Sequence, residues 1–164
     1  MNQENLARLV KLAGKKGLTI GSCESFTAGL FCASLASVPG ASAVLKGGLV
    51  TYCNEIKAKI AHVNPELLKQ KGAVSPEVCT EMAVNARELL GVDYGVSFTG
   101  NAGPSAQDGV AVGTFYIGIS KPGLTIVYKC YSSRPRNQLR EEAVDLVVEK
   151  LLDAIEMDGQ FLIF

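Results

Sequence analysis

Histidine is nearly absent from this 164-residue chain, which contains one, His62, and no tryptophan. A metal centre built on several imidazoles is therefore not expected, and a Ser-His-Asp triad would require His62 to lie beside a nucleophile. The five cysteines are scattered and form no C-x-x-C pair. Their odd number and their spacing argue against a disulfide framework and a zinc site, so we expect no metal ion.

Net charge is absent as well, since sixteen Lys and Arg balance sixteen Asp and Glu. No overall field would attract nucleic acid or an anionic membrane, although a local basic patch remains open. The longest apolar runs, such as residues 115–119, are far shorter than the roughly 20 residues that span a bilayer. The polar first residues carry no secretory signal pattern. We therefore expect a cytoplasmic protein that binds a small molecule at a local site.

The chain has the length of one ordinary domain, and 48% hydrophobic residues suffice for a sizeable core. No linker, repeat or low-complexity segment divides it, so residues 1–164 are predicted to form a single domain. Apolar spacing predicts helices over 3–16, 27–36, 55–61, 64–71, 76–90 and 136–156, and strands over 18–23, 43–52, 94–99, 112–119 and 124–131.

The order of these elements predicts a three-layer α/β/α sandwich with a mixed, mostly parallel sheet of about five strands. Helices and strands alternate early in the chain, whereas Lys121-Pro122-Gly123 is a hairpin signal that makes the last two strands antiparallel. The tail Phe161-Leu162-Ile163-Phe164 is unusually apolar. We expect it to dock on the core or on a second subunit, and we therefore expect a homo-oligomer.

The stretch from Gly21 to Gly29 lies where a predicted strand ends and a helix begins, near Ser25. A serine at such a junction has an exposed hydroxyl and nearby backbone N–H donors, as a nucleophile attacking a carbonyl requires. The alternative is that Ser25 or Thr27 only caps the helix. The local pattern leaves both interpretations open.

A serine nucleophile without a histidine needs another base, and a lysine can serve if its pKa is lowered. Lowering a lysine pKa from ~10.4 to near 7 corresponds to about 4 kcal/mol in favour of the neutral amine. Lys57 lies in the first turn of the predicted helix 55–61, capped by Asn54, where the helix dipole disfavours a cation. Its alternative is a solvated surface lysine. Tyr52 is a candidate to hydrogen-bond both Ser25 and Lys57, or a half-buried strand aromatic.

Three further features flank this pair. Glu24 is a candidate to orient the lysine or to bind a substrate hydroxyl, and otherwise an exposed acid near a helix start. The Gly100–Gly109 loop has a backbone suited to approaching a ligand, but it lacks a phosphate-loop pattern. Arg134, Arg136 and Arg140, before and within the first turn of the last helix, are candidates to bind a phosphate or form a solvated basic patch.

The segment Cys23-Glu24-Ser25-Phe26-Thr27-Ala28-Gly29 resembles the A-E-S-C-T-G-G signature of the CinA C-terminal domain family, the nicotinamide-nucleotide amidohydrolases. Other blocks match in the same order, from about Leu18 to the last helix. They are Ser37-Val38-Pro39-Gly40-Ala41-Ser42 (S-V-P-G-S-S), Thr51-Tyr52-Cys53-Asn54-Glu55-Ile56-Lys57 (T-Y-S-N-E-A-K), Gly72-Ala73-Val74-Ser75 (G-A-V-S), Thr99-Gly100-Asn101-Ala102-Gly103-Pro104 (T-G-I-A-G-P) and Val112-Gly113-Thr114 (V-G-T).

The resemblance implies deamidation of nicotinamide mononucleotide to nicotinate mononucleotide and ammonia, without a cofactor. Carried over by motif, Ser25 would be the nucleophile, Lys57 the base and Tyr52 its hydrogen-bonding helper. Backbone N–H groups from Ser25 to Thr27 would hold the oxyanion. The substrate-binding residues implied are Glu24, Phe26, Thr27, Thr99, Gly100, Asn101, Gly103, Arg136 and Arg140.

The chain also departs from the family pattern. Phe26 replaces a Cys beside the nucleophile, Ala28 replaces the first Gly, and Asn101 replaces an apolar residue. These departures leave a second hypothesis open, namely a catalytically silent CinA-like protein that binds a nucleotide or a partner in a regulatory or assembly role. Retention of the implied serine, tyrosine and lysine favours the enzyme.

Overall fold

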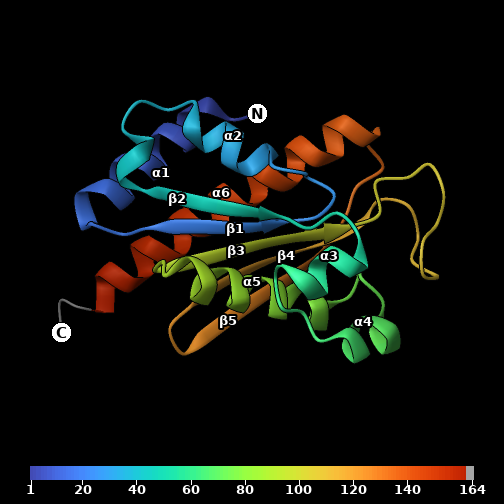
Figure 1. The fold of residues 1–164 in the computed structure, drawn as a ribbon. Coiled ribbons are helices and arrows are strands. Elements are labelled where there is room, and N and C mark those ends of the chain that lie inside the picture. The colour runs from blue at the N-terminus through green and yellow to red at the C-terminus, as the bar shows by residue number, and fades with distance from the viewer. Residues whose placement is uncertain (162–164) are drawn as a thin grey trace.

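A computed structural model describes residues 1–161 of the chain, with side chains through residue 158. The predicted docking of the apolar tail at 161–164 concerns side chains outside this described part. In chain order, the elements are α1 (Gln3–Lys16), β1 (Ile20–Glu24), α2 (Leu30–Ala36), the 3₁₀ turn η1 (Ala41–Ala43), β2 (Leu45–Val50), α3 (Asn54–Lys59), α4 (Pro65–Lys71), α5 (Pro76–Leu90), β3 (Tyr94–Gly100), β4 (Thr114–Lys121), β5 (Leu124–Tyr131) and α6 (Arg136–Phe161) (Figure 1).

The five strands form one mixed sheet in the order β2-β1-β3-β4-β5. β1 pairs in parallel with β2 and β3, whereas β3–β4 and β4–β5 are antiparallel. Four strands therefore point the same way and β4 alone is reversed, although parallel pairings make up only half of the neighbouring pairs. The mixed sheet and the late hairpin are confirmed. Because β1, β2 and β3 are parallel, the segments that follow them meet at one edge of the sheet.

Helices cover both faces of this sheet, which confirms the three-layer sandwich (Figure 1). α1, α2 and α6 pack together on one face, and α5 crosses the other face with α3 and α4 beside it. The three inner strands β1, β3 and β4 are buried along almost their whole length, while the edge strand β2 alternates between half-buried and exposed residues. Continuous burial explains why most residues of the inner strands are apolar or small, and Glu24 at the end of β1 is a charged exception.

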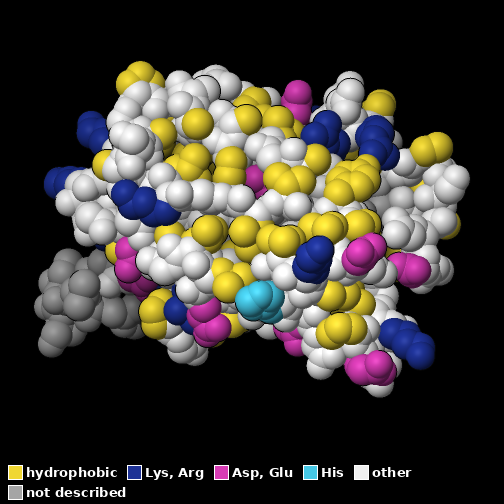
Figure 2. All heavy atoms as spheres, in the orientation of Figure 1, with side chains coloured by type: hydrophobic (Ala, Val, Ile, Leu, Met, Phe, Trp, Pro, Cys, Tyr) yellow, Lys and Arg dark blue, Asp and Glu magenta, His cyan; other side chains and the backbone are white. Residues whose placement is uncertain are grey.

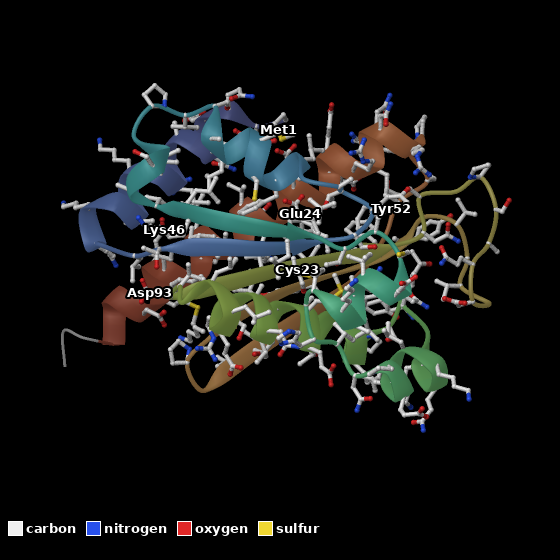
Figure 3. The ribbon with its side chains drawn as sticks, viewed as in Figure 1. Met1, Cys23, Glu24, Lys46, Tyr52 and Asp93 are labelled. Atoms are coloured by element: carbon white, nitrogen blue, oxygen red, sulfur yellow. The ribbon has the colours of Figure 1, made fainter. Side chains whose placement is uncertain are left out.

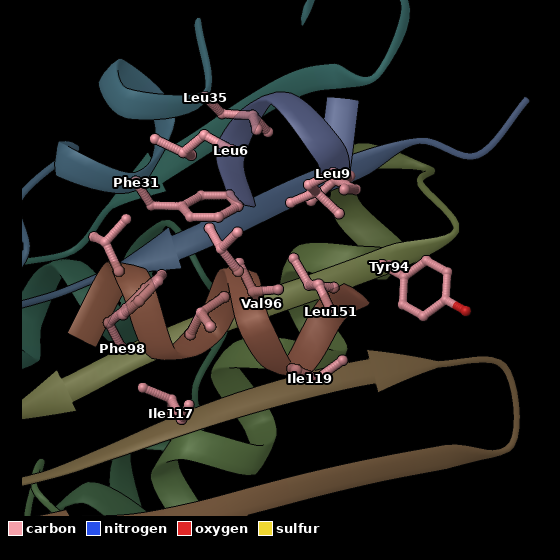
Figure 4. Packing of buried hydrophobic residues seen from close by; sticks show 14 of the residues in the cluster. Leu6, Leu9, Phe31, Leu35, Tyr94, Val96, Phe98, Ile117, Ile119 and Leu151 are labelled. Atoms are coloured by element: carbon pink, nitrogen blue, oxygen red, sulfur yellow. The ribbon is translucent and has the colours of Figure 1, made fainter. Parts of the chain in front are cut away.

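The main hydrophobic core lies between the sheet and the layer of α1, α2 and α6 (Figure 4). There the rings of Phe31 and Phe98 pack with their centroids 5.6 Å apart. Phe98 is fully buried, so the backbone of β3 is fixed where it passes the end of β1. Leu6, Leu9, Leu35, Val96, Ile117 and Leu151 fill the same cluster.

On one face of the described chain, the charged side chains are not separated by sign. Basic and acidic side chains are interspersed there, as Figure 2 shows. Within the described residues, no helix combines the length and the apolar character that a membrane crossing requires.

Helix α2 begins at Leu30, three residues later than the pattern predicts. The reason is backbone conformation, since Ala28 has a φ of 48° and Gly29 a φ of 96°, which no α-helix accommodates. Residues 26–29 therefore form a turn, and the helix is preceded by Gly29 without a side-chain cap. The interpretation of Ser25 or Thr27 as the cap of this helix is wrong.

Ala28→Gly is expected to raise the free energy of unfolding by about 0.5–1 kcal/mol, because glycine adopts a positive φ without the steric cost borne by alanine. Urea denaturation checks this value. As a control, Ala33→Gly, at an exposed position inside α2, should lower the free energy of unfolding by about 1 kcal/mol. A loss of stability in Ala28→Gly would show that the turn tolerates Ala28 without strain.

Candidate active site

Ser25 is the first residue after β1 and is held by its backbone on both sides. Its N–H donates to the carbonyl of Phe98 at 2.9 Å, and its own carbonyl accepts the N–H of Ala28 at 3.0 Å. The second bond closes a turn over residues 25–28 with Phe26 and Thr27 at its centre. The Ser25 hydroxyl is thus fixed at the edge of the sheet where the parallel strands end.

Lys57 reaches the same point from α3. Its Nζ donates to Ser25 Oγ at 2.8 Å and to the carbonyl of Thr51 at 2.9 Å. The side chain is only 1% exposed, so the alternative of a solvated surface lysine is wrong. A deprotonated amine in this position would accept the hydroxyl proton of Ser25.

Burial lowers the pKa of Lys57 below its ordinary value of 10.5, because the ammonium has lost most of its water. Among the residues that the structure describes, no carboxylate lies within ion-pair distance of its Nζ. The predicted contribution of the helix dipole is wrong, since α3 has six residues, is preceded by Cys53 rather than capped by Asn54, and carries Lys57 in its last turn. Desolvation is therefore the main cause of the lowered pKa of Lys57.

Tyr52 follows β2, near the start of α3 (Figure 3), and lines the cavity beside Ser25. Its side chain is 56% exposed. Its hydroxyl accepts a hydrogen bond from Arg136 Nη2 at 2.8 Å, and Arg136 Nη1 donates to the carbonyl of Gly103 at 2.7 Å. Within the described part of the chain, Tyr52 makes neither of the hydrogen bonds predicted to Ser25 and Lys57. It belongs instead to a bridge that joins the end of β2, the loop after β3 and the start of α6.

Glu24 is fully buried and serves the fold rather than the lysine (Figure 3). Its Oε1 accepts the N–H of Phe31 at 2.9 Å, and its Oε2 accepts the N–H of Cys32 at 3.2 Å and the hydroxyl of Ser22 at 3.1 Å. The carboxylate therefore satisfies the first N–H groups of α2 from the preceding strand. The expectation of an exposed acid or a residue that orients Lys57 is wrong.

Glu24→Gln is expected to lower the free energy of unfolding by about 2–3 kcal/mol, because the amide NH₂ would face buried N–H donors that now meet a carboxylate oxygen. Thermal unfolding followed by circular dichroism should show a Tm lower by about 5–10 °C. Glu4→Gln, in the exposed first turn of α1, should change the stability by less than about 0.5 kcal/mol. An unchanged Tm in Glu24→Gln would contradict the capping role.

The wall opposite Ser25 is built by the end of β3 and the loop that follows. Thr99 Oγ1 donates to the carbonyl of Ala73 at 2.6 Å. Asn101 is nearly buried; its Nδ2 donates to the carbonyl of Val110 at 3.1 Å and its Oδ1 accepts the N–H of Gly103 at 3.0 Å. These hydrogen bonds fix the end of β3 and the loop after it, whose residues 99–107 line the cavity.

Phe26 packs into the core and does not obstruct the nucleophile. Its side chain is 4% exposed, and its ring lies 5.8 Å from that of Phe115, centroid to centroid. Gly100 permits this packing, because a Cβ there would lie 2.5 Å from the Cβ of Phe115 and 3.1 Å from the ring of Phe26. The phenylalanine that replaces the family's cysteine therefore packs within the hydrophobic core.

Arg140 contacts the turn beside Ser25 from α6. Its Nε donates to the carbonyl of Phe26 and its Nη2 to that of Thr27, both at 2.9 Å. Its Nη1 donates to Asn137 Oδ1 at 3.3 Å. The guanidinium thus binds backbone of the chain itself, in contrast to the predicted contact with substrate.

The buried cysteines and the histidine are less well placed than Ser25 for nucleophilic attack or metal binding. Burial raises the pKa of the Cys23 thiol to about 11 and that of Cys79 to about 12, so both are thiols at neutral pH. His62, the cyan side chain in Figure 2, is exposed and does not line the cavity beside Ser25. Among the described residues, no group of three His, Cys, Asp or Glu is arranged to hold a metal ion.

Ser25 and Lys57 open into a cavity of ≈ 320 Å³. Of the residues predicted for the site, those that line it are Ser25, Phe26, Tyr52, Lys57, Thr99, Gly100, Asn101, Gly103 and Arg136, whereas Glu24, Thr27 and Arg140 do not. The site prediction missed Ala73 and Val74, and it included Ala102 and residues 104–107 only as part of the Gly100–Gly109 loop, without naming them individually. Ala73, Val74 and Ala102 lie within sequence blocks that match the family, which was the available signal. The contacts made by the carbonyls of Thr51 and Phe98 could not be predicted from the sequence, because every residue has a backbone carbonyl.

The fold and the site together define a three-layer α/β/α domain with a serine and a buried lysine paired at the carboxyl edge of its parallel strands. The chain belongs to the CinA C-terminal domain family, whose model matches residues 2–155.

Similar proteins agree with this assignment. A protein of Listeria monocytogenes described as competence-damage inducible is 45% identical over 144 residues, which are 85% of this chain and 35% of that protein. A protein of Geobacillus with the same description is 42% identical over 161 residues, 94% of this chain and 39% of that protein. The chain therefore spans about a third of the length of these curated relatives.

Solved structures of similar proteins share the fold over nearly their whole length. The competence or damage-inducible protein of Enterobacter asburiae superimposes with a TM-score of 0.90 at 30% identity, covering 93% of this chain and 97% of that one. The competence/damage inducible protein of Agrobacterium tumefaciens gives a TM-score of 0.89 at 29% identity, covering 94% of each chain.

Proposed function

We propose that this chain is an amidohydrolase that deamidates nicotinamide mononucleotide to nicotinate mononucleotide and ammonia. The observation that carries the proposal is the 2.8 Å hydrogen bond between Lys57 Nζ and Ser25 Oγ, formed by a lysine that is 1% exposed. A buried lysine without a carboxylate partner destabilises the fold unless it is neutral, and a neutral amine is the base that a serine nucleophile needs. The substrate comes from the resemblance of the sequence blocks to the family of amidohydrolases.

In the first step, the neutral amine of Lys57 takes the hydroxyl proton of Ser25 while Oγ forms a bond to the carboxamide carbon. The C=O electron pair moves to the oxygen and creates an oxyanion. The N–H of Phe26, a residue that lines the cavity, is the first available donor, and the N–H of Thr27, one peptide further along, is likewise without an acceptor among the described residues. They lie in the turn next to the nucleophile, as stabilisation of this charge requires.

In the second step, the Lys57 ammonium donates its proton to the amide nitrogen, the C–N bond breaks and ammonia leaves. The acyl group remains on Ser25 Oγ as an ester. A water molecule then loses a proton to Lys57 and attacks the same carbon, the C–Oγ bond breaks, and Ser25 recovers the proton. The acid that forms releases its proton to water and leaves as the nicotinate carboxylate, and both side chains return to their starting states.

Arg136 is the residue best placed for the substrate phosphate. It lines the cavity at the first position of α6, a helix of 26 residues, so an anion beside it meets both a guanidinium and the positive end of a helix dipole. The cavity of ≈ 320 Å³ falls within the range of about 300–1,000 Å³ that small-molecule sites occupy.

The proposal is tested by incubating the chain with nicotinamide mononucleotide and measuring ammonia with a coupled enzyme assay and nicotinate mononucleotide by chromatography. We expect the two products in equal amounts. Nicotinamide riboside, which lacks the phosphate, should be a poorer substrate. If the mononucleotide binds in calorimetry but releases no ammonia, the amidohydrolase is refuted and the catalytically silent CinA-like protein is the better description.

A further inference from the structure

Arg140 makes an unusual contact for an arginine near a substrate cavity, since its guanidinium binds two consecutive backbone carbonyls. Nε and Nη2 lie 2.9 Å from the oxygens of Phe26 and Thr27, which are 114 and 113 residues away in the sequence. We infer that Arg140 is a positioning residue that holds the turn 26–27 in the geometry needed to bind the oxyanion. This inference rests on the proposed hydrolysis at Ser25.

The direction of the N–H groups follows from peptide geometry. In a planar trans peptide, C=O and N–H point to opposite sides. The carbonyl of Phe26 and the N–H of Thr27 belong to the same peptide, so Arg140 directs that N–H away from itself. The neighbouring peptide is fixed in the same way, because the carbonyl of Ser25 accepts the N–H of Ala28 and thereby sets the N–H of Phe26. Each free donor is thus oriented by a bond on the other side of its peptide.

The charge of Arg140 strengthens the Thr27 N–H as a donor directly, and reaches the Phe26 N–H through the bond from the Ala28 N–H to the Ser25 carbonyl. Among the described residues, no carboxylate lies within ion-pair distance of its guanidinium. A cation bonded to the carbonyl side of a peptide polarises it and makes its N–H a better donor to an anion. The Thr27 side chain does not itself hold the turn by a hydrogen bond, since its buried hydroxyl has no partner among the described residues.

A role in binding the phosphate fits Arg140 less well than it fits Arg136. Arg140 does not line the cavity, and its Nε, Nη1 and Nη2 all donate to atoms of the chain. Arg136 does line the cavity. The two arginines, one helical turn apart, therefore have different tasks: Arg136 faces the substrate and Arg140 supports the turn behind it.

The test is Arg140→Lys, which keeps the charge but loses the planar fork that spans two carbonyls. We expect kcat for nicotinamide mononucleotide to fall about 10- to 100-fold and KM to change less than about twofold. The apparent pKa of the rate profile should stay the same, because Lys57 is untouched. Arg8→Lys is the matched control, since Arg8 is exposed, pairs with Glu156 and does not line the cavity; it should leave kcat and KM unchanged.

A second measurement separates this inference from the choice of substrate. A fluorophosphonate probe labels activated serines whatever the natural substrate, and mass spectrometry gives its rate of attachment to Ser25. Arg140→Lys should slow labelling about 10- to 100-fold. In Arg140→Ala, millimolar guanidinium should restore part of that rate, whereas an unfolded variant would not respond.

The two failures are distinguishable. If the native chain releases no ammonia but labels at Ser25, the substrate is wrong, and the effect of Arg140→Lys on labelling still decides the role of Arg140. An unchanged kcat or labelling rate in Arg140→Lys overturns the positioning role, as does a raised KM with an unchanged kcat, which would indicate a substrate contact. A native chain that neither releases ammonia nor labels at Ser25 overturns both proposals.

Discussion

Ser25→Ala is expected to lower kcat for ammonia release from nicotinamide mononucleotide by about 10³-fold or more. The change removes the hydroxyl oxygen that is hydrogen-bonded to the buried amine of Lys57, while the bond from that amine to the carbonyl of Thr51 remains. It leaves the backbone bonds of residue 25 to Phe98 and Ala28 in place, because these involve only its N–H and carbonyl. The fold and the cavity should therefore persist without the nucleophile. Steady-state kinetics with purified protein measures the loss.

Binding measurements identify the cause of the lost activity. Calorimetry should show that Ser25→Ala binds the mononucleotide within about threefold of the native affinity, since the carboxamide contact is a small part of the interface. Ser42→Ala, at an exposed position outside the cavity, should keep full activity. Undiminished turnover in Ser25→Ala would remove Ser25 from the mechanism, whatever the substrate.

The parts of the fold that sequence predicts are those with local causes. Each predicted helix and strand is present, because apolar periodicity and glycine or proline signals act within a few residues. The hairpin at Lys121-Pro122-Gly123 is an example. The late start of α2 shows the limit, since the left-handed conformation of Ala28 has no mark in its side chain and depends on the turn that Arg140 and Ser25 hold.

The sequence predicts which residues lie at the site, but it does not predict what each of them contacts. Parallel strands bring Ser25, Tyr52 and Thr99 to one edge, so residues that follow strands are good candidates by their position in the chain alone. The partners of Glu24 and Arg140 could not be predicted in this way, because each depends on how a helix lies against the strand ends. Lys57 was predicted as a site residue because a serine nucleophile without a histidine needs another base. Burial, rather than the predicted helix dipole, lowers the pKa of its amine.

Replacement of Lys57 by methionine is expected to have opposite effects on activity and on stability. Lys57→Met should lower kcat by about 10²- to 10⁴-fold, the usual contribution of a general base. The native rate should rise with pH as the amine loses its proton, with an apparent pKa below 10.5, because burial lowers the pKa of Lys57. The residual rate of the variant should lack this rise.

The stability effect follows from the same lowered pKa. Between the pKa of Lys57 in the folded chain and 10.5 in the unfolded chain, the unfolded state binds more protons, so the native free energy of unfolding rises with pH across that window. Below the window the native fold holds a buried ammonium, and the advantage of Lys57→Met is greatest there. That advantage should shrink towards pH 10.5 by about 1.4 kcal/mol for each pKa unit of lowering.

Urea denaturation at a series of pH values measures this difference between the native chain and Lys57→Met. Lys59→Met is the matched control, because Lys59 is exposed on the same short helix and should leave both the rate profile and the pH dependence of stability unchanged. Parallel stability curves for Lys57→Met and the native chain would mean that the amine is not perturbed by folding. In that case a 2.8 Å contact with Ser25 would be an ordinary ammonium–hydroxyl bond, and Lys57 would not be the base.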